Sequence, residues 1–286
     1  MSTFTRRRFL AGVTAAGAST LAGRIALAEA RAAVRGADQV ALGDTGLKTS
    51  LLGLGTGTRG GREQRELGQE DFTRLFRYAL DRGVRYIDTA DSYRIHAMVG
   101  AALRGVPRDD YFLLTKTGAR DAAAARSDID RFRRELGVER FDVMLMHCMT
   151  TGDYPNRMQG VMDVLSEAKE KGIIGSVGVS CHGWDPLCAS ADCDWNDVHL
   201  VRINPFGSHM DGEPADVAEQ IAKMHRQGRG VLGMKIFGEG NCDTREKRLE
   251  SLRYVLGLGT VHAFTIGFGS RQQIDETLAL IEEASA

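Results

Sequence analysis

The feature that most constrains the fold is a run of apolar and β-branched residues, of strand length, that recurs eight times between residues 51 and 267. The stretches between these runs show helical spacing of apolar residues, as at Phe72, Leu75 and Phe76. We therefore predict eight strands that alternate with helices. The predicted strands are Leu51–Thr56, Val84–Asp88, Tyr111–Lys116, Phe141–His147, Gly175–Ser180, Val198–Asn204, Gly230–Ile236 and Ala263–Gly267.

This alternation favours a parallel sheet that is covered by helices. Gly83, Gly137, Gly172 and Gly228 lie shortly before predicted strands, where the end of a helix favours glycine. Eight such units predict a closed α/β barrel, the (β/α)8 or TIM barrel, which usually takes about 250 residues. A doubly wound open sheet is the alternative. It is disfavoured because residues 53–57 match the glycine-rich dinucleotide fingerprint only in part.

The composition excludes some partners and some kinds of site. The chain has 37 basic and 38 acidic residues and a formal net charge of -1, so no net field recruits nucleic acid or an acidic membrane surface. Five cysteines, an odd number, argue against a fully paired disulfide framework. Cys188 and Cys193 form a disulfide only if the protein works in an oxidising compartment. Their spacing predicts no metal site.

The N-terminal segment has the features of an export signal. The segment Thr5–Leu10 resembles the twin-arginine signal of bacteria, and Ala-x-Ala cleavage sites follow at Ala26–Ala28 and Ala28–Ala30. The apolar stretch between them is too short and too weakly apolar for a stable membrane anchor. We therefore predict a signal peptide over residues 1–33 and a single domain over residues 34–286. The expected location is periplasmic, after export in the folded state by the twin-arginine translocation machinery.

Polar side chains stand where three successive predicted strands end. The second strand ends in Asp88, the third in Lys116 and the fourth in His147, and Tyr93 follows shortly after Asp88. Each has an ordinary structural explanation when it is taken alone: a helix cap, a solvated lysine, a hydrogen-bonded histidine and a packing aromatic. In a closed barrel, however, they converge on the rim where barrel enzymes carry their active sites. An Asp and a Lys buried there need to pair.

Five segments, in order, resemble the motifs of the aldo-keto reductase family. They are the opening at residues 41–57, the segment Asp88–Tyr93, the pair Thr115-Lys116, the strand that ends at His147, and Gly178–Ser180. The similarity extends from about residue 38 to residue 286. The resemblance implies an enzyme that reduces small-molecule aldehydes or ketones with NADPH, or with NADH.

The resemblance also implies a catalytic tetrad of Asp88, Tyr93, Lys116 and His147. Tyr93 is then the proton donor to the developing alkoxide. The ammonium of Lys116 is expected to lower the pKa of Tyr93, and Asp88 to keep Lys116 charged and placed. His147 is expected to orient or polarise the substrate carbonyl.

The family's nucleotide contacts carry over less completely. Cys181 and His182 stand where the family commonly has Asn-Phe, and Gly267, Phe268 and Gln273 replace its common Lys-Ser and Arg. No metal is expected, because a neighbouring Cys and His rarely form a complete site alone. NADPH is therefore the family default and NADH the alternative. The candidate cofactor-binding residues are Gly55, Thr56, Ser180, Asn204, Lys235, Gly267, Ser270, Gln273 and Glu276.

Two other functions stay open. A nucleotide-binding regulatory or sensor protein with little turnover would have nearly the same sequence. A Schiff-base lyase on the same barrel would use Lys116 or Lys235 as its nucleophile.

Overall fold

The computed structural model describes residues 33–286, and within them the eight predicted strands form a closed parallel barrel. The TIM-barrel prediction is confirmed, and the alternative of a doubly wound open sheet is wrong. Each strand begins and ends within two residues of its predicted bounds. The predicted signal peptide lies outside the described residues, apart from residue 33. The strands are β3 (Leu52–Gly55), β4 (Tyr86–Asp88), β5 (Phe112–Thr117), β6 (Phe141–Met149), β7 (Ile174–Cys181), β8 (Val198–Arg202), β9 (Gly230–Met234) and β10 (Ala263–Gly267).

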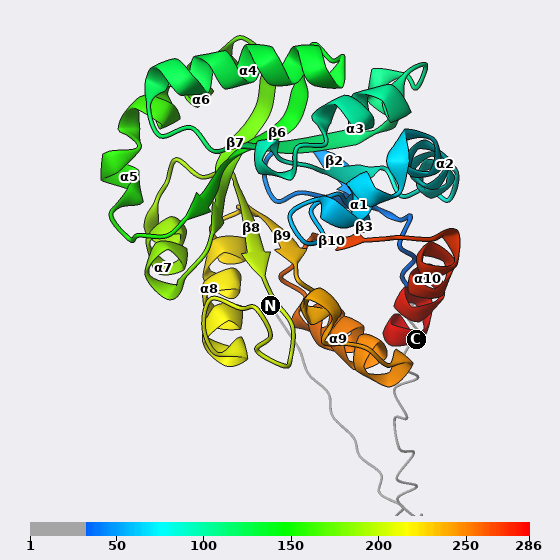
Figure 1. Ribbon diagram of the computed structural model, residues 1–286. Helices are drawn as coiled ribbons and strands as arrows, with labels where there is room; N and C mark the ends of the chain where they lie inside the picture. The colour runs from blue at the N-terminus through cyan, green and yellow to red at the C-terminus, as the bar shows by residue number, and fades with distance from the viewer. Residues whose placement is uncertain (1–32) are drawn as a thin grey trace, which may run out of the picture. The chain divides into compact units, whose positions relative to one another are not determined.

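Helices lie around the outside of these strands (Figure 1). The predicted apolar faces are the ones they bury, as Phe72, Leu75 and Phe76 do in α2. The four glycines predicted to end helices all have positive φ, between 68° and 82°. The helices are α1 (Arg62–Glu66), α2 (Gly68–Asp81), α3 (His96–Leu103), α4 (Ala122–Leu136), α5 (Tyr154–Arg157), α6 (Gln159–Glu170), α7 (Trp184–Asp192), α8 (Pro214–Arg226), α9 (Arg245–Leu258) and α10 (Arg271–Ser285).

The barrel separates two apolar cores, and each strand alternates between them. Along β5, Phe112 and Leu114 belong to the core inside the barrel, whereas Leu113 belongs to the core between strands and helices. Successive side chains of a strand point to opposite faces. Lys116 therefore points into the barrel, and Thr115 and Thr117 point outward.

A short antiparallel hairpin, which the sequence analysis did not predict, precedes the barrel. Its strands β1 (Gln39–Ala41) and β2 (Lys48–Ser50) have three residues each, too few to give a periodic signal. Leu42, which follows β1, is fully buried and joins the core inside the barrel. The hairpin thus fills the end of the barrel interior away from the carboxyl ends of the strands.

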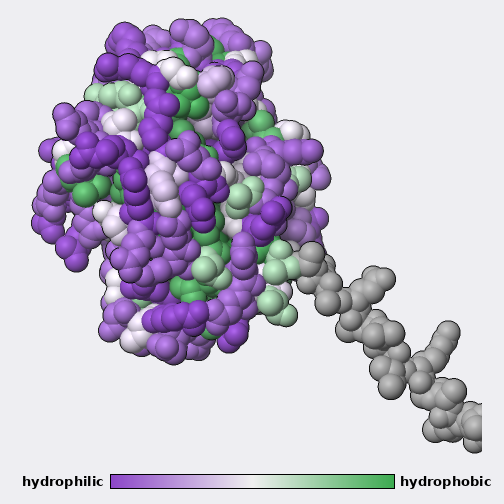
Figure 2. Space-filling view, turned by 90° about the vertical axis from the view of Figure 1, so that its right-hand side faces the viewer, coloured by the Kyte–Doolittle hydropathy of each residue, from purple (hydrophilic) through white to green (hydrophobic). Residues whose placement is uncertain are grey.

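The outer surface is largely polar. The face in Figure 2 is mainly hydrophilic, and hydrophobic residues appear there only in small separate areas. Within residues 33–286 no helix combines the length and the apolar character needed to cross a membrane, and the same residues hold no cluster of three or more metal-ligating side chains. All five cysteines carry free thiols, so Cys188 and Cys193 form no disulfide.

Candidate active site

An ion pair buried at the rim of the barrel forms the centre of the site. Lys116, at the end of β5, donates a hydrogen bond to the carboxylate of Asp88, at the end of β4. Its Nζ also lies 3.0 Å from the carbonyl oxygen of Thr89 and 3.3 Å from the hydroxyl of Tyr93. Lys116 is fully buried and Asp88 is 4% exposed. One ammonium therefore contacts the carboxylate and the phenol that the sequence places beside it, and also a backbone carbonyl.

The short 3-10 helix η1 (Asp91–Tyr93) positions the phenol. The ring of Tyr93 lies against Gly57, where an added Cβ would stand 2.4 Å from that ring. The guanidinium of Arg65 donates to the carbonyl oxygen of Tyr93 from the other side. The alternating glycines of residues 53–57 thus have a steric role. Gly53 leaves room for the ring of Tyr86, and Gly57 leaves room for that of Tyr93.

The pKa values of these groups follow from burial and from the ion pair. Burial by itself lowers the pKa of Lys116, but Asp88 and Tyr93 together raise it above its ordinary value. Burial raises the pKa of Asp88, and Lys116 opposes this. The pKa of Tyr93 is also raised, because burial outweighs the charge of Lys116. The expectation that Lys116 lowers the pKa of Tyr93 is right for the direction of that interaction and wrong for the net shift.

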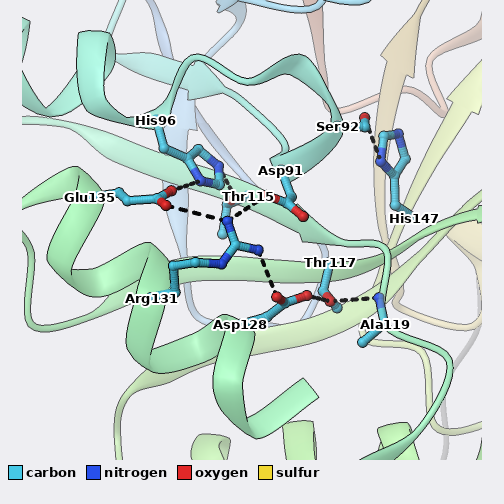
Figure 3. Close-up of polar contacts among 10 residues, drawn as sticks. All are labelled: Asp91, Ser92, His96, Thr115, Thr117, Ala119, Asp128, Arg131, Glu135 and His147. Atoms are coloured by element: carbon cyan, nitrogen blue, oxygen red, sulfur yellow. Dashed lines mark hydrogen bonds and ion pairs between the residues drawn. The ribbon is translucent and has the colours of Figure 1, made fainter. Parts of the chain in front are cut away.

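His147 is the fourth residue of the site, and it lies at a local irregularity of β6. The pairing of β6 with β7 shifts register between Met146 and Met149, and Cys148 has a positive φ of 58°. Such a bulge redirects a side chain at the end of a strand. The ring of His147 stands edge-on to that of Tyr93, with 5.7 Å between centroids, and its Nδ1 lies 3.3 Å from the Ser92 hydroxyl (Figure 3).

Burial, reinforced by the charge of Lys116, lowers the pKa of His147 to about 3. The imidazole is therefore neutral at physiological pH, with one ring nitrogen protonated. A hydroxyl that donates to Nδ1 leaves the proton on Nε2. When the Ser92 hydroxyl donates in this contact, Nε2 carries the ring proton and can donate to a substrate oxygen.

A cavity of about 270 Å³ adjoins Asp88 and Tyr93. It lies beside the carboxyl ends of β3, β9 and β10, and its walls combine apolar side chains with charged ones of both signs. Four of the predicted cofactor-binding residues line it: Gly55, Lys235, Gly267 and Gln273. Residues that the sequence analysis did not select also line it, among them Thr58, Arg59, Met234, Phe237, Glu239, Arg248 and Phe268.

Three predicted cofactor-binding residues have other partners. Thr56 is buried and donates to the carbonyl oxygen of Asp88 at 2.9 Å. Ser180 is buried and accepts from the backbone N–H of Cys148 at 3.2 Å. Asn204 donates to two backbone carbonyls and accepts from two backbone N–H groups, all within its own or the neighbouring loop. The Asn204 side chain therefore has all its hydrogen bonds within the loops, and its assignment to the nucleotide stays a prediction.

The last two predicted residues lie on α10, outside the lining. Ser270 caps this helix and accepts from the backbone N–H of Gln273 at 3.3 Å. Glu276 stands 3.9 Å from Arg248 and so touches the cavity only through that side chain.

The cavity loops carry residues that sequence reasoning missed, Arg59 and Glu239 among them, beside the predicted Lys235. Lys235 and Glu239 pair at 2.7 Å, and both have positive φ, as Arg59 does. Left-handed backbone at non-glycine residues is uncommon and clusters at functional sites. No sequence pattern signals it at a lysine, a glutamate or an arginine.

The close contact of Gly57 with Tyr93 gives a first prediction. If the predicted tetrad catalyses the reaction, Gly57→Ala is expected to displace the phenol and to lower kcat by about 10- to 100-fold, because small misplacements of a reacting group are costly. Gly118→Ala is the matched control, since an added Cβ there meets no atom within 4 Å. Steady-state kinetics measure kcat for both variants and test the prediction. Equal kcat values for the two would show that the contact does not position Tyr93.

The model of the aldo/keto reductase family matches residues 51–255 of this chain. The chain belongs to the aldo/keto reductase family. It is thus a member of an oxidoreductase family, and its barrel and the order of its rim residues agree with that membership.

Individual relatives support the family assignment. An aldo-keto reductase of Mycolicibacterium paratuberculosis is 34% identical over 169 residues, which cover 57% of this chain and 54% of that protein. The chain spans about half the length of the mycobacterial relatives it matches. L-galactose dehydrogenase of Arabidopsis thaliana is 27% identical and covers 85% of this chain and 88% of its own length.

Solved structures support the fold. An aldo-keto reductase of Bacillus halodurans in its holo form superposes with a TM-score of 0.70 at 18% identity. The alignment covers 87% of this chain and 96% of that one. At this identity the likeness is evidence for the barrel alone.

Proposed function

We propose that this protein reduces aldehydes or ketones to alcohols with a nicotinamide nucleotide, and that Tyr93 donates the proton. The observation that carries the proposal is the buried ammonium of Lys116, which contacts both the carboxylate of Asp88 and the hydroxyl of Tyr93. This arrangement places a charge-supported proton donor at the rim of the barrel, next to a cavity.

The cavity fits a nicotinamide nucleotide in its chemistry. Met234, Phe237 and Phe268 provide apolar walls, and Arg59, Lys235 and Arg248 provide cations suited to phosphate groups. Arg59 and Lys235 each pair with a carboxylate of the lining, so a phosphate would share these cations with Glu63 and Glu239. Gly55 and Gly267 add no side-chain bulk to the lining. When bound, NADPH or NADH supplies the hydride. Because the family's usual basic residues near α10 are replaced, the choice between NADPH and NADH stays part of the proposal.

The residues of the chain divide the remaining chemistry among them. As a hydride adds to the carbonyl carbon, negative charge develops on the carbonyl oxygen, and the Tyr93 hydroxyl transfers its proton there. The phenolate left behind lies 3.3 Å from the ammonium of Lys116, which stabilises it until solvent returns a proton. In this proposal the neutral His147 carries its ring proton on Nε2 and donates a hydrogen bond that orients the carbonyl.

The state of Lys116 disfavours the Schiff-base alternative. A nucleophilic lysine needs a lowered pKa, so that the free amine is present at neutral pH. The pKa of Lys116 is raised by Asp88 and Tyr93, and its ammonium is held by three oxygen atoms. Lys235, the other candidate, pairs with Glu239.

The test is turnover of NADPH and of NADH, followed by nicotinamide absorbance, with a panel of aliphatic, aromatic and sugar aldehydes and ketones. We expect consumption of one nucleotide that depends on the carbonyl and is lost in Tyr93→Phe. Nucleotide binding without turnover of any carbonyl would overturn the proposal and favour the regulatory or sensor protein. Borohydride trapping of a substrate on a lysine would favour the lyase.

A second prediction concerns pH. Reduction needs a protonated Tyr93, whose pKa lies above its ordinary value of 10.0, so activity is present below that pKa and lost above it. His147 stays neutral down to a pH of about 3. We therefore expect kcat/KM for reduction to be flat from about pH 5 to 9 and to fall only at higher pH. A midpoint near 6.5 would mean that an ordinary histidine controls the reaction.

We also propose that the protein works in the periplasm after twin-arginine export. The support is the N-terminal sequence, in which Arg6 and Arg7 precede Phe9 and Leu10. Substituting both arginines by lysine should retain the protein in the cytoplasm, as cell fractionation can measure. Unchanged export of that variant would overturn this proposal and leave the enzymatic one untouched.

A further inference from the structure

A polar network outside the barrel connects the two segments that carry Tyr93 and Lys116 (Figure 3). Its centre is Arg131 of α4, whose guanidinium donates to Asp91 at 2.8 Å and to Asp128 at 2.7 Å. The same guanidinium lies 3.3 Å from Glu135. Asp91 belongs to η1 and stands two residues before Tyr93. Arg131 thus holds the proton-donor segment against a helix.

The network reaches β5 on both sides of Lys116. Asp128 accepts from the Thr117 hydroxyl at 2.5 Å. Glu135 lies 3.2 Å from Nδ1 of His96, whose Nε2 lies 3.0 Å from the Thr115 hydroxyl. Both threonines point outward while Lys116 points inward. The network therefore binds the two residues that flank Lys116, and the ammonium of Lys116 faces the site.

The inner part of the network is sealed from solvent, and its outer part is not. Thr115 and Thr117 are fully buried and His96 is 3% exposed, whereas the side chains of Arg131 and Asp91 are 35% and 33% exposed. Ion pairs with this exposure contribute little to stability. Here they position the side chains instead, because a planar guanidinium that donates from two nitrogens fixes both the distance and the direction of its partners.

The charges make Arg131 the residue on which the arrangement depends. Three carboxylates, those of Asp91, Asp128 and Glu135, converge on one guanidinium. Without it they repel one another, which pushes Asp91, in the short connection between β4 and α3, away from the carboxylates of α4. Such a movement shifts Tyr93 relative to Lys116, while Lys116 stays fixed by Asp88.

We propose that Arg131 is a positioning residue that sets the contact between Tyr93 and Lys116 from outside the barrel. The inference rests on the proposed function in so far as it predicts a change in kcat. It predicts in addition a change in the mobility of residues 89–94, and that change does not depend on any activity.

The experiment compares Arg131→Met with Arg126→Met. Arg126 lies on the same helix and pairs with Glu167 of α6, so its loss removes an α4 ion pair without touching η1. We expect Arg131→Met to lower kcat at least about tenfold, with the nucleotide Kd and the carbonyl KM within about twofold of wild type. Arg126→Met should retain wild-type kcat, and Tm should change little in both.

The conservative variant and hydrogen exchange complete the test. Arg131→Lys keeps a charge but cannot hold Asp91 and Asp128 in two directions, so it should restore kcat only in part. Amide exchange over residues 89–94 should be faster in Arg131→Met than in wild type or Arg126→Met. Unchanged exchange would overturn the inference, as would a kcat equal to that of Arg126→Met. Absence of turnover in the wild type would overturn the proposed function and leave exchange to decide this inference.

Discussion

Tyr93→Phe is expected to lower kcat for carbonyl reduction by about 10²- to 10⁴-fold, the usual contribution of a general acid. The substitution removes the hydroxyl that lies 3.3 Å from Lys116 and keeps the ring that packs against Gly57. The local packing is therefore preserved, and the nucleotide Kd should stay close to that of wild type. Single-turnover kinetics and fluorescence titration with the nucleotide measure the two quantities separately.

Tyr78→Phe is the control for this prediction. Tyr78 lies on α2, its hydroxyl donates to Asp275 of α10 at 2.6 Å, and it is not among the residues that line the cavity. Its loss should leave kcat unchanged. If Tyr93→Phe turns over like the wild type, another group donates the proton, and the tetrad assignment fails whatever the substrate is.

The fold could be predicted because its signals are local and repeated. Eight apolar runs with helical stretches between them specify the barrel, and the strand-end positions of Asp88, Lys116 and His147 place them on one rim. Inward and outward positions follow from alternation along each strand. The three-residue strands β1 and β2 gave no such signal, and a hairpin of this kind is recognised only when Leu42 is seen to fill the barrel interior.

The cofactor residues were harder to predict because loop conformation decides which side chains are free to contact a ligand. Asn204 stands where the family resemblance suggests a nucleotide contact, yet loop carbonyls and amides of residues 206–208 and 235 use all of its hydrogen-bonding capacity. Arg59 and Arg248 line the cavity, but in the sequence they are two among many arginines. Which arginine faces a cavity depends on loop conformation, and composition does not encode it.

The pKa of Tyr93 could likewise be predicted only in part. Sequence reasoning identifies the charge that acts on the phenol, since Lys116 and Tyr93 belong to neighbouring motifs. It does not supply the burial of the phenol, which has the larger effect and the opposite sign. The proposed proton donor therefore keeps its proton up to high pH, and would release it only as charge develops on a substrate oxygen.

The second large effect is expected for Lys116→Met. The substitution leaves the carboxylate of Asp88 buried without its partner, and breaking a buried ion pair in this way destabilises a protein by about 3–5 kcal/mol. Carbonyl reduction should also be lost, because no charge remains to stabilise the Tyr93 phenolate. Denaturant unfolding and steady-state kinetics measure the two effects on the same preparation.

The double variant Lys116→Met/Asp88→Asn separates stability from catalysis. It removes the unpaired charge, so it should recover most of the free energy of unfolding but none of the activity. The pH dependence has a defined sign as well. Burial raises the pKa of Asp88 above its ordinary value, and loss of Lys116 raises it further, so Lys116→Met should gain stability as pH falls and Asp88 takes up a proton. Recovery of turnover in the double variant would mean that the ion pair maintains the fold only, and that the phenol needs no ammonium beside it.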